Sequence, residues 1–102
     1  MNQLPDNLNI PAPLRAAAQQ FAQIRQRIHA RPELGAEVSN TAELVAGLLR
    51  QWGYSVHTVG GHGLVGQLKV GDGTRTIGLR ADIDALPMQE RTGLPYASEV
   101  PG

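Results

Sequence analysis

Residues 41–58, TAELVAGLLRQWGYSVHT, decide the fold because the spacing of their apolar residues changes within the stretch. Up to Trp52 the apolar side chains recur at helical spacing and share one face. Gly53 suits the left-handed position that closes many helices. After it, residues 54–58 alternate apolar and polar side chains as a half-buried strand does. The stretch therefore predicts a helix that leads directly into a strand.

A second helix is predicted before this one. From Leu14 onward apolar residues recur every three or four positions among glutamines and arginines, and the segment is rich in alanine, which favours helix. Pro13 fits a first helical turn, and Pro32 ends the helix because proline excludes the preceding residue from helical geometry. Residues 1–13 hold three prolines and three asparagines and are expected to form an irregular lead-in.

Residues 32–40 connect the two helices. Asn40 is followed three residues later by Glu43, a spacing typical of a capping box at a helix start. The connector is therefore expected to end at a helix whose first amides are capped by Asn40 and Glu43.

Two further strands are predicted after residues 54–58. They are residues 64–70 and 76–81, separated by a Gly-Asp-Gly turn signal at 71–73. Residues 82–102 show no sustained period and are expected to form a loop. The order of two helices and three strands predicts an α/β fold. Because one face of such a sheet lacks a cover, we interpret residues 14–102 as the front part of a larger domain.

Composition excludes several classes of protein. Nine Lys and Arg balance nine Asp and Glu, so the chain lacks the cationic field of a nucleic-acid-binding protein. The absence of cysteine excludes a disulfide framework and a thiol nucleophile in this chain. No segment has the length and hydropathy of a membrane span, and the first residues do not resemble a secretory signal. The simplest expectation is a cytoplasmic protein without nucleic-acid or membrane partners.

Asp82 and Asp84 are the main candidates for chemistry. Two carboxylates one residue apart, directly after an apolar strand, can project to one side of the strand's carboxyl end, where open α/β sheets bind ligands. Carboxylate oxygens are also metal ligands. Asp residues equally end strands as turn formers, so spacing alone leaves both interpretations open. Arg80 either orients these carboxylates or forms an ordinary ion pair.

Other polar motifs predict less. His57 and His62 are expected to face solvent, and His29 to be a helix-terminal or hydrogen-bonded histidine. Their spacing does not favour an all-histidine metal site. The glycines around His62 lack the Lys-Ser/Thr of a phosphate-binding loop and indicate a hairpin turn. No Ser or Thr nucleophile motif is present.

Taken together, three stretches resemble one family. They are IRQRIHARPELG (24–35), residues 41–58 quoted above, and TIGLRADIDALPMQERTGLPYAS (76–98). They are similar to the N-terminal part of metal-dependent amidohydrolases that include hippurate hydrolase, N-acyl-amino-acid amidohydrolase and indole-acetyl-amino-acid hydrolase, within the aminoacylase and carboxypeptidase superfamily. LRADIDALP and TGLPYAS are its most specific motifs.

The resemblance implies a zinc-peptidase-like catalytic α/β domain with an inserted dimerisation domain, which is absent from this chain. It also implies a divalent metal pair (zinc, manganese or nickel) that activates water to hydrolyse N-acyl amino acids or related amides. The full-length parent is expected to be a homodimer or homotetramer.

The resemblance assigns few site residues to this chain. Asp84 matches a carboxylate that orients a metal-bound histidine, and Asp82, at a ligand position in the wider superfamily, is the weaker candidate. The metal ligands are expected beyond Gly102, so this chain alone is expected to bind no metal and to be inactive. His29, Pro32 and Glu33 match a family signature whose physical role the sequence does not explain. The alternative hypothesis is a stand-alone, non-catalytic binding or subunit-like domain derived from the fold.

Overall fold

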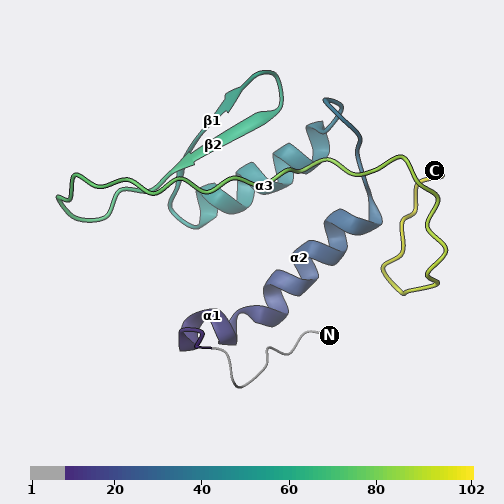
Figure 1. Ribbon diagram of the computed structural model, residues 1–102, viewed down its shortest axis with the longest axis horizontal. Coiled ribbons are helices and arrows are strands. Elements are labelled where there is room, and N and C mark those ends of the chain that lie inside the picture. Colours follow the sequence, from purple (N-terminus) through teal and green to yellow (C-terminus); the bar gives the residue numbers. More distant parts are fainter. Residues whose placement is uncertain (1–8) are drawn as a thin grey trace. The chain divides into compact units, whose positions relative to one another are not determined.

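The computed structural model describes residues 9–102, which form two compact units. One unit contains residues up to 32 together with 88–102, and the other contains residues 33–87. The elements in chain order are helices α1 (Ala12–Ala16), α2 (Ala18–Ala30) and α3 (Ser39–Gln51), then strands β1 (Ser55–Val59) and β2 (Gly63–Gln67). The chain is therefore α/β, with one two-stranded antiparallel sheet among the described residues (Figure 1).

The first unit is built on the predicted amphipathic helix, which the structure divides at Ala17 into α1 and α2. Proline stands near the first turn of α1, where a missing N–H costs no hydrogen bond. Helix α1 begins inside the lead-in expected over residues 1–13, of which residues 1–8 lie outside the described part. Arg31 ends α2 in non-helical geometry directly before Pro32, as expected of a residue that precedes proline.

The second unit contains the stretch that decides the fold. Helix α3 ends at Gln51, and Gly53, with a φ of 92°, provides the left-handed conformation predicted for it. Strand β1 follows at once and pairs with β2, with Val56 opposite Gly66 and His57 opposite Val65. The turn between them uses Gly60 and Gly61, whose φ angles of 57° and 89° suit a tight hairpin connection.

The hairpin packs on α3 in the same unit, as Figure 1 shows. The contact is close at Gly66, where a Cβ would lie 3.2 Å from the side chain of Leu49 and 3.5 Å from that of Tyr54. A larger residue in this position of β2 would therefore require the side chain of Leu49 to shift by a few tenths of an ångström.

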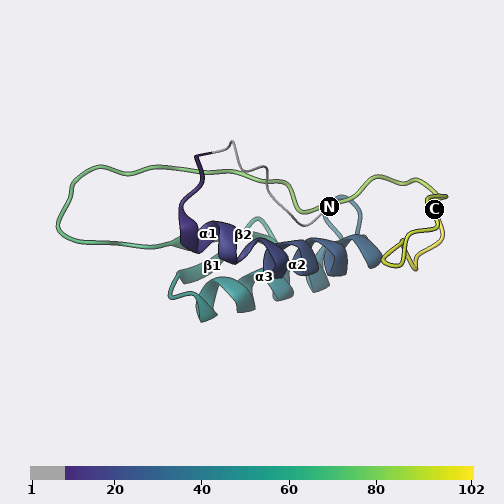
Figure 2. The same cartoon turned by 90° about the horizontal axis from the view of Figure 1, so that it is seen from below.

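Two predictions fail in the second unit. The capping box is wrong: α3 begins at Ser39 after the N-cap residue Val38, so Asn40 already lies within the first turn and does not cap it. The third strand over residues 76–81 is not formed, and Figure 2 shows this part of the chain as a long extended excursion after β2. A strand exists by pairing with another strand, and within residues 9–102 no strand pairs with this segment.

The buried core consists of small residues. Among the described residues those with less than a tenth of their surface exposed are Ala22, Val38, Thr41, Ala42 and Ala46. By contrast, Ile77 and Leu79, which lie in the extended segment after β2 (residues 68–84), are 86% and 96% exposed. Large apolar side chains normally supply the burial that stabilises a domain, and many of those in residues 9–102 are exposed.

We expect the 102-residue chain alone to bind a hydrophobic dye and to melt over a broad temperature range. Replacing Ile77 and Leu79 by serine is expected to lower dye fluorescence without changing the helical circular dichroism signal, because these side chains make little contact. Ala42→Ser, at a buried position of α3, is the matched control and is expected to lower the helical signal. A sharp, cooperative melt of a monomer that binds no dye contradicts this expectation.

Candidate functional site

Asp82 and Asp84 lie in the second unit, at the end of the extended segment that follows β2. Both side chains are exposed. Asp82 forms an ion pair with the guanidinium of Arg80 across 3.0 Å, and both side chains are mostly exposed. This is an ordinary surface ion pair, one of the two interpretations of Arg80 that the sequence left open. The side chain of Asp84 has no hydrogen bond or ion pair with any residue from 9 to 102, which leaves its carboxylate open to a further group.

An open groove of about 910 Å³ borders the two carboxylates within this unit. Its lining comes from residues 35–38 before α3, from α3 and the hairpin, and from the extended segment after β2. Apolar side chains such as Val45, Leu49 and Leu64 form one part of it, and residues 79–84 form another. The carboxylates are therefore placed beside an apolar surface, an arrangement common to ligand sites.

The described residues do not by themselves form a metal centre. No three His, Asp or Glu side chains come close enough within residues 9–102 to hold one ion. A zinc site takes four ligands, of which a catalytic site draws three from protein. Asp82 and Asp84 alone do not fit a metal pair, and no catalytic step through a metal follows from this chain.

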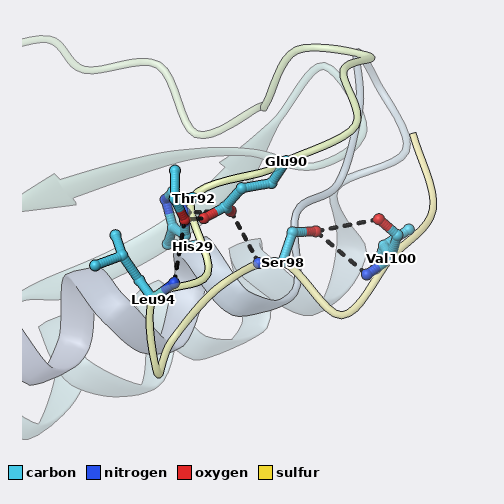
Figure 3. A network of polar contacts seen from close by, with 6 residues as sticks. All are labelled: His29, Glu90, Thr92, Leu94, Ser98 and Val100. Atoms are coloured by element: carbon cyan, nitrogen blue, oxygen red, sulfur yellow. Dashed lines mark hydrogen bonds and ion pairs between the residues drawn. The ribbon is translucent and has the colours of Figure 1, made fainter.

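A second polar cluster lies in the first unit, where residues 88–102 fold against the end of α2 (Figure 3). Glu90 is its centre. The Nε2 atom of His29 lies 2.7 Å from one carboxylate oxygen of Glu90, and the backbone N–H of Ser98 donates to the same oxygen across 2.9 Å. The hydroxyl of Thr92 donates to the other oxygen. One carboxylate thus joins α2 to both sides of the 92–98 loop.

These donors lower the pKa of Glu90. The hydrogen bond from Thr92 contributes most, followed by the Ser98 amide and then His29, while partial desolvation opposes them. Aromatic contacts reinforce the same junction: the ring of Tyr96 meets His29 edge-on at 5.6 Å, and the guanidinium of Arg25 lies 5.7 Å from its centre. The backbone N–H of Glu99 also donates to the carbonyl of Ala30, the last residue of α2.

The structure gives His29 and Glu33 contacts that the sequence did not explain, and Pro32 the helix-ending position that it predicted. His29 contacts the Glu90 carboxylate, and Pro32 follows Arg31, the residue after the last of α2. In the second unit the carboxylate of Glu33 accepts the backbone N–H groups of Asn40 and Thr41 at the start of α3. His29 is thus a hydrogen-bonded histidine near a helix end, as interpreted, and His57 and His62 are exposed, as predicted.

Sequence reasoning missed Glu90 and the capping role of Glu33. Glu90 lies 61 residues from His29, and no local period connects them. Both residues belong to the stretches that carry the family resemblance, which was the available signal.

Comparison with known proteins identifies the family. The chain is 46% identical to hippurate hydrolase of Campylobacter jejuni over 97% of its own length and 24% of that protein. It is 37% identical to N-acetyl-L-cysteine deacetylase of Bacillus subtilis, with 90% of this chain and 22% of the relative covered. It is 44% identical to an IAA-amino acid hydrolase of Arabidopsis thaliana, with 78% and 18% covered.

The chain belongs to this family of amidohydrolases, and it spans about a quarter of the length of the relatives that it matches most extensively. No protein-family model and no solved structure matches it. None of the helices in residues 9–102 has the length and apolar character needed to cross a bilayer.

The Glu90 cluster generates a prediction that depends on pH. Because the pKa of Glu90 is lowered from its usual 4.5, its ionised form stabilises the docked loop above pH 4.5, and this stabilisation is lost as the pH falls through the lowered value. We expect Glu90→Gln to reduce amide-exchange protection of residues 94–100 at pH 7. This difference from the wild type is expected to disappear in acid below the folded-state pKa.

The matched control for that experiment is Glu99→Gln. The Glu99 side chain forms a solvent-exposed pair with Arg31 at 3.2 Å, and such pairs contribute little. Equal loss of protection in the two variants, or a Glu90→Gln effect that persists unchanged in acid, contradicts a role for the Glu90 charge.

Proposed function

We propose that the full-length protein carrying this chain is an amidohydrolase that cleaves the amide bond of N-acyl amino acids or related small amides. The observation that carries the proposal is the 46% identity to hippurate hydrolase over nearly the whole chain. The names of the other relatives, a deacetylase of N-acetyl-L-cysteine and an IAA-amino acid hydrolase, point to the same class of bond. In each case an acyl group is joined to an amino acid.

Residues 14–102 are proposed to be the N-terminal portion of a zinc-peptidase-like catalytic domain. In that domain residues 76–81 would form the third strand that the sequence pattern predicts, paired with strands supplied by the rest of the protein. The exposure of Ile77 and Leu79 supports this, because their alternation gives one apolar face that nothing in residues 9–102 covers. A homodimer or homotetramer in the cytoplasm remains the expectation from the resemblance.

Asp84 is the residue of this chain proposed to serve the reaction. Its carboxylate is unpaired within residues 9–102 and stands next to a backbone contact at Ala85. It would orient a histidine that binds the divalent metal, with the metal ligands supplied outside this chain. Asp82 is the weaker candidate, since its carboxylate is already paired with Arg80.

We expect the full-length protein to release the free amino acid from N-benzoylglycine or another N-acyl amino acid, and the isolated 102 residues to release none. A panel of N-benzoyl, N-acetyl and indole-acetyl amino acids, assayed for the liberated amine, tests this and ranks the acyl groups. Loss of activity on dialysis against a chelator, restored by zinc, manganese or nickel, would identify the metal. A full-length protein that is folded, metal-supplied and inactive on the whole panel sinks the proposal in favour of a non-catalytic domain.

Asp84→Asn in the full-length protein is expected to lower kcat/KM or metal content by about 10–100-fold, the usual cost of removing a group that supports a metal ligand. The melting temperature should stay nearly unchanged, because the side chain is exposed and makes no polar contact within residues 9–102. Asp72→Asn, at an exposed turn position, is the matched control. Full activity and metal content in Asp84→Asn would reduce Asp84 to a residue that ends a strand.

A further inference from the structure

Glu33 contacts two separate parts of the second unit at once. Its side-chain oxygens accept the backbone N–H of Thr41 across 2.5 Å and that of Asn40 across 3.2 Å. Its own backbone carbonyl accepts the N–H of Ala85 across 2.7 Å. Because Ala85 directly follows Asp84, Glu33 connects the start of α3 to the segment that carries Asp82 and Asp84.

Helix α3 depends on this side chain for its cap. The N-cap position is held by Val38, whose apolar side chain makes no capping hydrogen bond. Thr41 is only 5% exposed, so solvent does not readily satisfy its N–H, and an unmet buried donor is costly. A carboxylate is also the group that the positive end of a helix favours. Hydrogen bonds from Thr41, led by its side chain, and from Asn40 lower the pKa of Glu33 against a desolvation cost, so the group is ionised near neutral pH.

The extended segment depends on the backbone of Glu33. Among the described residues, one backbone–backbone hydrogen bond joins residues 68–87 to another segment, the one from Ala85 to Glu33. Leu34 and Ala85 form an isolated parallel bridge at the same place. The residue after Asp84 is therefore held by a hydrogen bond to Glu33, and the side chain of Glu33 is in turn bonded to the start of α3.

We propose that Glu33 is a positioning residue for Asp84, an inference that rests on the amidohydrolase function proposed above. By capping α3, the side chain of Glu33 limits how far the backbone of Glu33 is able to move relative to that helix. The carbonyl then holds the Ala85 amide and sets where the Asp84 carboxylate emerges. A small displacement of a group that orients a reacting centre lowers the reaction rate strongly. The helix cap therefore affects the rate although it does not touch the reacting atoms.

The first test is amide hydrogen exchange in the full-length protein. Glu33→Ala is expected to lower protection at Asn40 and Thr41 and also at Ala85, whereas Glu33→Gln, which keeps an acceptor oxygen, should restore part of both. Glu43→Ala is the matched control, an exposed carboxylate later in α3 whose side chain has no polar contact within residues 9–102. Loss of protection at Asn40 and Thr41 with Ala85 unchanged overturns the proposal, because Glu33 would then be only a helix cap.

The second test is a double-mutant cycle on kcat/KM with Asp84→Asn. If Glu33 acts through Asp84, Glu33→Ala lowers kcat/KM by about tenfold in the wild-type background and hardly at all once Asp84 is asparagine. Effects that multiply independently contradict the proposal. Glu33→Gln provides the same comparison if the alanine variant fails to fold.

The two tests separate failure of the inference from failure of the proposed function. A wild-type protein that is folded, supplied with metal and inactive on the whole panel refutes the amidohydrolase function, while exchange at Ala85 still decides whether Glu33 holds residues 82–85 in place. If the protein is active and the exchange protection of Ala85 is the same in the wild type and in Glu33→Ala, the inference about Glu33 is refuted and the proposed function is not.

Discussion

The hydrogen bonds of Glu33 are the constraint on which the second unit depends. Helix α3 starts after an apolar residue and would leave its first amides without acceptors, and the segment that carries Asp82 and Asp84 would have no backbone anchor. One residue supplies both needs, the first with its side chain and the second with its carbonyl. A buried amide without an acceptor costs on the order of 1–3 kcal/mol, which is large where the buried side chains are mainly alanine, valine and threonine.

The elements that the sequence predicted correctly are those whose information is local. Apolar residues at helical spacing produced α2 and α3, and Gly53 ended α3 through its own left-handed φ. The hairpin followed from alternation on both sides of a glycine turn. The third strand failed because strand formation is a property of a pair: residues 76–81 have the alternating pattern but no pairing partner within residues 9–102.

The candidate site divides in the same way. Asp82 and Asp84 could be found from the sequence because their spacing and their position after an apolar run are local facts. The hydrogen-bond acceptors that hold the chain together, Glu33 and Glu90, could not be found in this way. Glu90 meets His29 across 61 residues, and the carbonyl of Glu33 reaches an amide far along the chain. The sequence predicted a capping box at Asn40 and Glu43 because that pattern is local, whereas the true cap comes from a residue upstream of the helix.

The first unit is assembled from two ends of the described chain, and this sets an order of events during synthesis. Helix α3 and the β1–β2 hairpin contact one another and are close in sequence, so they are able to form as soon as they leave the ribosome. The contacts of helix α2 with Glu90, Tyr96 and Ser98 form later. At about 5–20 residues per second, these residues are synthesised several seconds after the helix. Closing this long loop carries an entropic cost that is met only when the Glu90 network forms. The His29 face of α2 is therefore uncovered in the nascent chain until residues 88–102 have been synthesised.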